Sequence, residues 1–125
     1  MSSIASRVTS SGKTMQEQAL DMRRKFPDRL PVFLAKAKSC TRLDVPEVDK
    51  NKYLAPKTLT VAELMAVVRK RIVVAPEVAL FFMVKVGKQG VLLPSSMTIG
   101  EAYEQFVNDG TNFLELEYMG ENTFG

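Results

Sequence analysis

Three Thr-x-x-Glu motifs mark the starts of helices in this chain. They begin at Thr14, Thr60 and Thr98. In this capping box the threonine oxygen accepts a hydrogen bond from a first-turn N–H, and the glutamate binds the backbone N–H of the threonine. Apolar residues at helical spacing follow each motif, which predicts three helices. The predicted stripes are Met15, Ala19, Met22 and Phe26; Val61, Leu64, Met65, Val68 and Ile72; and Ile99, Ala102, Tyr103 and Phe106.

The ends of two helices are also predicted. Pro27 should end the first helix, because a proline disfavours helical conformation in the residue before it. Gly110 suits the C′ position of the third helix.

Five segments have the apolar and alternating residues of β-strands. The order is helix, strand, strand, helix, strand, strand, helix, strand, with a charged loop at 39–51 between the first two strands. In a chain of 125 residues, this order predicts one α+β domain with helices packed on a single sheet. The predicted strands are 31–38, 52–59, 79–86, 90–93 and 112–118.

Two phenylalanines lie on the opposite side of their strands from the expected core. If Val32 and Leu34 face inward, Phe33 faces outward. Phe113 alternates in step with two glutamates, which favour water, so it also faces away from the core. The pair predicts either an apolar recess for a partner or a second small core beneath the first helix, and both interpretations stay open.

The composition excludes many kinds of active site. The chain has 0 His, so it has no imidazole base or ligand, and its 1 Cys cannot form an internal disulfide. We interpret Cys40 as an inert thiol, because a nucleophilic cysteine needs an activating base. No segment has the roughly 18 apolar residues of a membrane span, and the N-terminus is not a signal peptide. We expect no metal, no cofactor and no enzymatic activity.

Two basic triplets and one glycine motif have alternative interpretations. The triplets at 23–25 and 69–71 fall late in predicted helices, where cations stabilise the helix end, but they also suit acidic peptides or lipid headgroups. The sequence "GKQG", Gly87 to Gly90, matches an RNA-binding loop, but its apolar flanks favour a β-hairpin turn.

The segments "RRKFPDRLPVFLAKA", "DKNKYLAPKTLTVAELMAVVRKRI" and "PEVALFFMVK" occur in this order. They resemble the autophagy ubiquitin-like modifiers, the family of the GABA-receptor-associated protein and its microtubule light-chain relatives. The resemblance runs from about Met15 to Gly125. It implies a ubiquitin-like β-grasp with a mixed four- to five-stranded sheet and extra N-terminal helices. We assign the domain to residues 14–119, between a flexible segment, 1–13, and a flexible tail, 120–125.

The resemblance implies that the carboxylate of Gly125 is the reactive group. Family members expose a C-terminal glycine, usually after an aromatic residue, as Phe124 and Gly125 stand here. An E1-like enzyme would activate it with ATP, an E2-like enzyme would carry it as a thioester, and phosphatidylethanolamine would receive it. A cysteine protease belongs to the same system. The lipid would anchor a cytoplasmic protein to the autophagosome membrane.

The resemblance also implies a peptide site for cargo receptors. A peptide with an aromatic anchor, an aliphatic anchor and acidic residues would add a strand at Lys52 to Leu54. Arg29 and Arg71 would meet the acidic residues. The aromatic pocket would use Met22, Pro31, Phe33, Lys52, Leu54 and Phe113, and the aliphatic pocket Tyr53, Ala55, Pro56, Leu59, Leu64 and Val67.

The chain departs from the family at several places. The loop from Cys40 to Glu47 is longer, Ala55 is smaller than the usual valine, and residues 64–66 replace positions that are often aromatic. These changes predict a reshaped aliphatic pocket. The alternatives are a modifier conjugated to proteins, and a basic adaptor that binds nucleic acid or the cytoskeleton; our preferred interpretation expects no nucleic acid.

Overall fold

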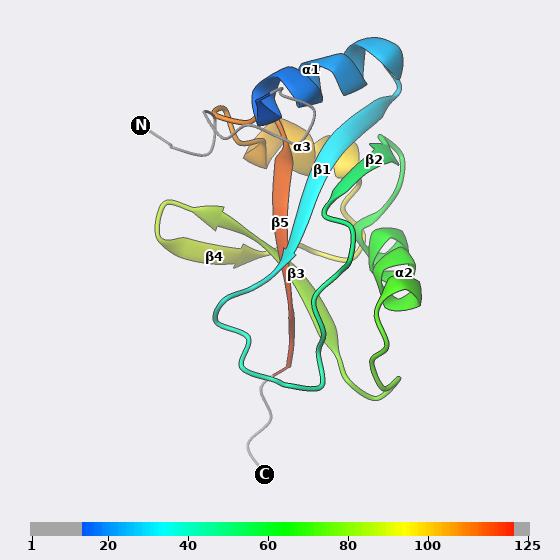
Figure 1. Ribbon diagram of the computed structural model, residues 1–125, viewed down its shortest axis with the longest axis vertical. Coiled ribbons are helices and arrows are strands. Elements are labelled where there is room, and N and C mark those ends of the chain that lie inside the picture. The colour runs from blue at the N-terminus through cyan, green and yellow to red at the C-terminus, as the bar shows by residue number, and fades with distance from the viewer. Residues whose placement is uncertain (1–13, 122–125) are drawn as a thin grey trace.

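Three helices and a five-stranded mixed sheet make up the fold in the computed structural model, which describes residues 14–121 (Figure 1). The order of elements confirms the order predicted from the sequence. The elements are α1 Met15–Lys25, β1 Arg29–Lys36, β2 Lys52–Pro56, α2 Val61–Arg71, β3 Leu80–Val86, β4 Gln89–Leu92, α3 Ile99–Phe106 and β5 Leu114–Gly120.

All three predicted capping boxes form. In the first, the Glu17 N–H donates to Thr14 Oγ1 at 3.1 Å, and the Thr14 N–H donates to Glu17 Oε1 at 2.9 Å. The boxes at Thr60 and Thr98 repeat this geometry. Each box satisfies backbone donors that the first turn of a helix leaves without a partner, so the sequence fixes where the helices begin.

The predicted end of α3 is wrong. The helix ends at Phe106 with Val107 as its C-cap, so Gly110 is not at the C′ position. The side chain of Asn108 closes a separate turn instead, because its Oδ1 accepts from the Gly110 N–H at 2.8 Å. Asn112 then adopts the left-handed conformation, with φ of 60°.

The sheet order is β2-β1-β5-β3-β4. The parallel pair β1 and β5 lies at its centre, and the other neighbours are antiparallel. Strands β2 and β4 are therefore the two edges. A turn at Gly87, which has φ of 63°, joins β3 to β4 and confirms the hairpin predicted for the glycine motif.

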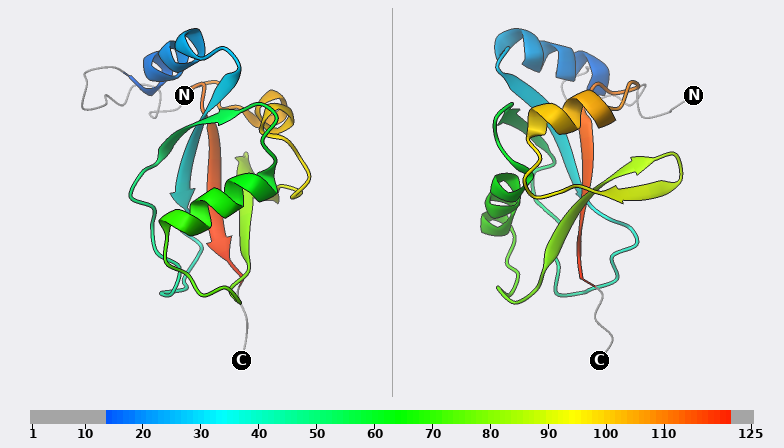
Figure 2. Two further views of the ribbon diagram at one scale, coloured as in Figure 1. Left: turned by 90° about the vertical axis from the view of Figure 1, so that its right-hand side faces the viewer. Right: turned by 180° about the vertical axis from the view of Figure 1, so that it is seen from behind.

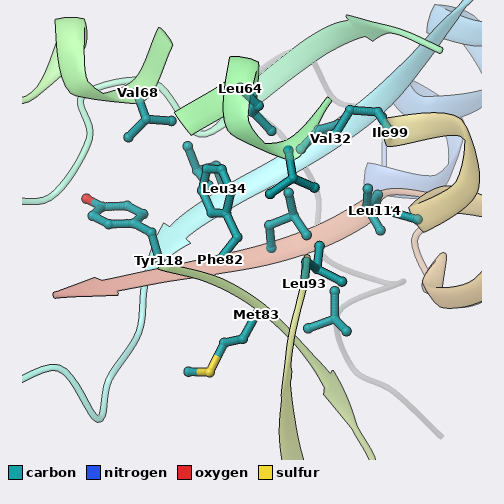
Figure 3. Close-up of a cluster of buried hydrophobic side chains, with 14 of the residues drawn as sticks. Val32, Leu34, Leu64, Val68, Phe82, Met83, Leu93, Ile99, Leu114 and Tyr118 are labelled. Carbon is teal, nitrogen blue, oxygen red and sulfur yellow. The ribbon is translucent and has the colours of Figure 1, made fainter. Parts of the chain in front are cut away.

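The main core lies between the sheet and helix α2, which crosses one face of it (Figures 2 and 3). Leu114, Leu116 and Tyr118 of β5 are fully buried, as their alternation predicts. The α2 stripe is also buried except for Met65, which is half-buried. Residues labelled in Figure 3 include Val32, Leu34, Leu64, Val68, Phe82, Ile99 and Tyr118.

A second, smaller core lies beneath α1, on the other side of the sheet. Phe113 is fully buried there with Met15 and Ala19, and Met22 and Phe33 pack against them. Both phenylalanines face away from the main core, and the second core predicted as one alternative is present. The described residues contain one N-terminal helix, and any further helix expected before it would fall in 1–13, outside them.

Candidate functional site

Strand β2 offers a free backbone edge. In the part of the chain that the structure describes, it pairs with β1 alone. The segment predicted to accept a peptide strand, Lys52 to Leu54, lies within it. An edge strand of this kind has unpaired N–H and C=O groups that can bind another strand.

The residues predicted for the aromatic pocket come together on the α1 side of β2. Leu54 lies opposite Pro31, and Lys52 lies opposite Phe33. Directly paired residues share one face of a sheet, so these four side chains are neighbours. Met22 approaches the same face from α1 through its contact with the second core.

Phe113 supports this face from beneath. Its ring is 0% exposed and meets the half-buried ring of Phe33 edge to face, with centroids 6.4 Å apart. A peptide at β2 would therefore reach Phe33 first. Phe113 contacts the predicted site through the ring of Phe33.

Apart from Pro56, the residues predicted for the aliphatic pocket lie on the α2 side of β2. Pro56 alternates with Ala55, so it faces the α1 side together with Leu54. Tyr53 and Ala55 share this face with Val32 and Leu30, their partners in β1. Ala55 and Leu64 are each 3% exposed and belong to the main core. They form the floor, and the accessible surface comes from half-buried Tyr53 and Leu59 with exposed Val67.

Two cationic side chains lie near the ring of Tyr53 at this edge. Lys50 Nζ lies 5.3 Å and Arg71 Cζ 5.8 Å from the centre of its ring. Arg71 also lies 3.6 Å from Asp49 Oδ1. Burial raises the pKa of the Tyr53 hydroxyl, which has no hydrogen-bond partner among the described residues. The positive charge expected at Arg71 is present, and Asp49 partly offsets it.

Arg29 takes the place expected for the second cation. It is exposed at the start of β1, opposite Pro56 at the end of β2. Asp49 and Lys50 were not predicted from the sequence, because only the fold brings Lys50 to the ring of Tyr53 and Asp49 to Arg71.

Two hollows in the described structure lie away from the β2 edge. One, of about 200 Å³, opens between the outer face of β1 and β5 and the end of α3, and Phe33 is part of its wall. The other, of about 430 Å³, lies between the start of α2 and strand β3. The sequence predicted neither.

Gly125, the predicted conjugation residue, lies outside the described residues. The described chain ends at Glu121, one residue after β5, with its N–H bonded to the Ala79 carbonyl at 2.9 Å. Strand β5 includes Gly120, where the tail was expected to begin. None of the helices within 14–121 has the length and hydrophobicity needed to cross a membrane.

A mixed five-stranded sheet with a central parallel pair, crossed by α2, defines a ubiquitin-like protein. Comparison with known proteins identifies its family among the ubiquitin-like proteins. The family profile described as "Autophagy protein Atg8 ubiquitin like" matches residues 14–125. The chain therefore belongs to the Atg8 family of ubiquitin-like autophagy proteins.

Individual relatives agree with this assignment. Autophagy-related protein 8d of Arabidopsis thaliana is 43% identical over 110 residues, which cover 88% of this chain and 85% of that protein. Autophagy-related protein 8 of Mycosarcoma maydis is 43% identical over 108 residues, covering 86% and 85%. The crystal structure of Trypanosoma brucei ATG8 matches with a TM-score of 0.76 at 35% identity and covers 89% of each chain.

Proposed function

We propose that this protein is a non-enzymatic modifier that is joined through Gly125 to phosphatidylethanolamine, and that its β2 edge binds short peptides of cargo receptors. The match of the family profile through to Gly125 supports conjugation. The register between β1 and β2 supports peptide binding, because it puts apolar side chains on both faces of a free edge.

The conjugation chemistry needs only the terminal carboxylate of this chain. The carboxylate attacks the α-phosphorus of ATP and displaces pyrophosphate. An enzyme thiolate then attacks the acyl carbonyl and releases AMP. Finally, the amine of phosphatidylethanolamine attacks the thioester, loses a proton and expels the thiolate, leaving an amide. A terminal glycine suits this sequence, because it has no side chain to obstruct attack at the carbonyl.

The peptide geometry follows from strand alternation. In an extended peptide, residues three positions apart point to opposite faces. An aromatic–x–x–aliphatic peptide added along β2 would direct one anchor toward Pro31 and Phe33 and the other toward Tyr53 and Leu59. The bound strand would gain main-chain hydrogen bonds from β2, and the anchors would give specificity.

The basic helix ends are largely engaged within the fold, so they give no separate support to a nucleic-acid adaptor. Arg69 donates to the Val78 carbonyl, and Arg23 lies 5.4 Å from the centre of the Tyr103 ring. We place the unconjugated protein in the cytoplasm, where it meets E1-like, E2-like and protease enzymes, and the conjugate on the autophagosome membrane.

Deleting Gly125 tests the conjugation. The wild type and the shortened chain are incubated with the activating and carrier enzymes, ATP and vesicles containing phosphatidylethanolamine. Wild type should become vesicle-bound, whereas the shortened chain should stay free with an unchanged unfolding temperature. Vesicles of phosphatidylcholine alone are the control. Attachment of the shortened chain would contradict the proposal.

A further inference from the structure

The long loop between β1 and β2 packs against the end of β5. The Tyr118 hydroxyl donates to the Pro46 carbonyl at 2.6 Å, and the Ala37 N–H donates to the Tyr118 carbonyl at 2.8 Å. Val45 of the loop is 0% exposed. The loop is therefore fixed beside the point where the chain leaves the sheet, as the lower part of Figure 1 shows.

Arg42 joins this loop directly to the chain beyond β5. Its Nη1 donates to the Glu121 carbonyl at 2.7 Å. Its Nε and Nη2 donate to the two carboxylate oxygens of Asp44, at 2.9 Å and 2.7 Å. This bidentate contact holds the plane of the guanidinium, so the two N–H groups of Nη1 point in fixed directions, one of them at the Glu121 carbonyl.

The backbone of Arg42 is held as well. Lys36 Nζ donates to its carbonyl at 3.1 Å. The hydrogen bond with Asp44 raises the pKa of Arg42 and lowers the pKa of Asp44, so both groups stay charged near neutral pH. A charged donor at a carbonyl makes a stronger hydrogen bond than a neutral one.

The loop packs closely against the end of β5. A Cβ atom on Gly120 would lie 2.9 Å from Val45 Cγ2 and 3.0 Å from Arg42 Cδ. At the next residue, Glu121, the N–H is bonded to Ala79 and the carbonyl to Arg42. Both polar backbone groups of the last described residue are thus bound by different parts of the fold.

We propose that Arg42 is a positioning residue for conjugation, because it holds the carbonyl of Glu121, the last described residue before Gly125. This inference rests on the proposed function. Four residues reach at most about 14 Å, so the carboxylate can be delivered only near Glu121. Transfer needs the reacting atoms about 3–3.5 Å apart, so the orientation of the Glu121 carbonyl should affect how often the chain end reaches that distance.

Only the fold brings Arg42 to the end of β5. It lies in the loop between β1 and β2, within Cys40 to Glu47. The arginine and the carbonyl it binds are 79 positions apart in the sequence.

The test compares Arg42→Gln, Arg42→Lys and Asp44→Asn with wild type in thioester formation by the activating enzyme. Arg24→Gln is the matched control, since Arg24 is also paired with a carboxylate, that of Asp21, and lies in α1. We expect Arg42→Gln to lower kcat about three- to tenfold, with less than about a twofold change in KM, because enzyme docking is unaffected. Arg42→Lys should recover part of the rate, Asp44→Asn should lose part of it, and Arg24→Gln should match wild type.

A second measurement separates positioning from stability. Amide hydrogen exchange at Glu121 and ¹⁵N relaxation of residues 122–125 should show faster motion in Arg42→Gln than in Arg24→Gln, at an equal unfolding temperature. Equal kcat for Arg42→Gln and wild type would overturn the role of Arg42. So would a lower kcat that tracks a lower unfolding temperature without a change in tail motion. Absence of a thioester with wild type would instead overturn the proposed function, together with the role in it given to Arg42.

Discussion

The rings of Phe33 and Phe113 meet edge to face beneath α1, with centroids 6.4 Å apart and planes at 82°. This pair joins the first strand of the sheet to the residue that precedes the last strand. It fixes α1 on the fold and supports the surface where a peptide's aromatic anchor would lie. Aromatic pairs of this geometry contribute about 0.5–1.5 kcal/mol beyond the area that they bury.

Replacing Phe113 with alanine should destabilise the fold rather than remove a surface contact. The ring is completely buried, and a Phe→Ala change at such a site costs about 3–5 kcal/mol. Urea unfolding measures the loss, and hydrogen exchange should show that α1 becomes less protected. Phe113→Leu, which retains most of the apolar contact, should cost much less. A loss below about 1 kcal/mol for Phe113→Ala would contradict the second core.

Leu54 is the better probe of peptide binding, since it is half-buried on the edge strand. Leu54→Ser should weaken the binding of an acidic–aromatic–x–x–aliphatic peptide by about 1–3 kcal/mol, as measured by titration calorimetry. The matched control is Leu92→Ser on β4, the opposite edge, where Leu92 is 59% exposed. Equal weakening by both variants, or by neither, would mean that the peptide does not bind along β2.

Arg29 and Arg71 should differ in the salt dependence of their contributions. Arg29 is exposed, so Arg29→Ala should weaken peptide binding by about 0.2–1 kcal/mol at low salt and should leave it almost unchanged at 1 M. The screening length falls from about 10 Å at 0.1 M salt to about 3 Å at 1 M. Arg71 also packs over the ring of Tyr53, so part of the peptide affinity that Arg71→Ala loses should still be lost at high salt. If the Arg29→Ala loss does not change with salt, its role is not electrostatic.

The capping glutamates should make stability depend on pH. Backbone hydrogen bonds from Thr60 and Thr98 hold the pKa values of Glu63 and Glu101 below the ordinary 4.5. A carboxyl group with a lowered folded-state pKa contributes stability above its unfolded pKa and loses it as the pH falls through the folded value. The variant Glu63→Gln with Glu101→Gln keeps the shape of the caps without their charge. Its unfolding temperature should lie below that of wild type near pH 6 and approach it near pH 3. A constant difference across this range would exclude the charge effect.

Features that depend on residues close together in the sequence were the ones predicted best. Capping boxes and apolar stripes are local, so the starts of all three helices and the burial of Leu116 and Tyr118 were correct. The prediction of Gly110 at the C′ position of α3 was wrong, because the side chain of Asn108 forms a turn that the apolar periodicity does not reveal.

The candidate site depended on contacts between distant segments. The resemblance implied the edge and its two sets of residues. The register puts Lys52 and Leu54 on one face of β2 and Tyr53 and Ala55 on the other, but it puts Pro56 on the face of Leu54 rather than with the aliphatic set. Alternation showed that Phe113 faces away from the main core, but its complete burial depends on the packing of α1. The contact between Arg42 and Glu121 joins residues 79 positions apart and has no local signal.

The most direct test of conjugation through Gly125 is the chemical state of this residue in the membrane-bound protein. The protein is isolated from membranes of cells in which autophagy has been induced, digested, and analysed by mass spectrometry of its C-terminal peptide. We expect an amide between the Gly125 carboxyl group and the amine of phosphatidylethanolamine, absent from the cytosolic fraction. A free carboxylate on the membrane-bound protein, or an isopeptide bond to a lysine of another protein, would contradict it.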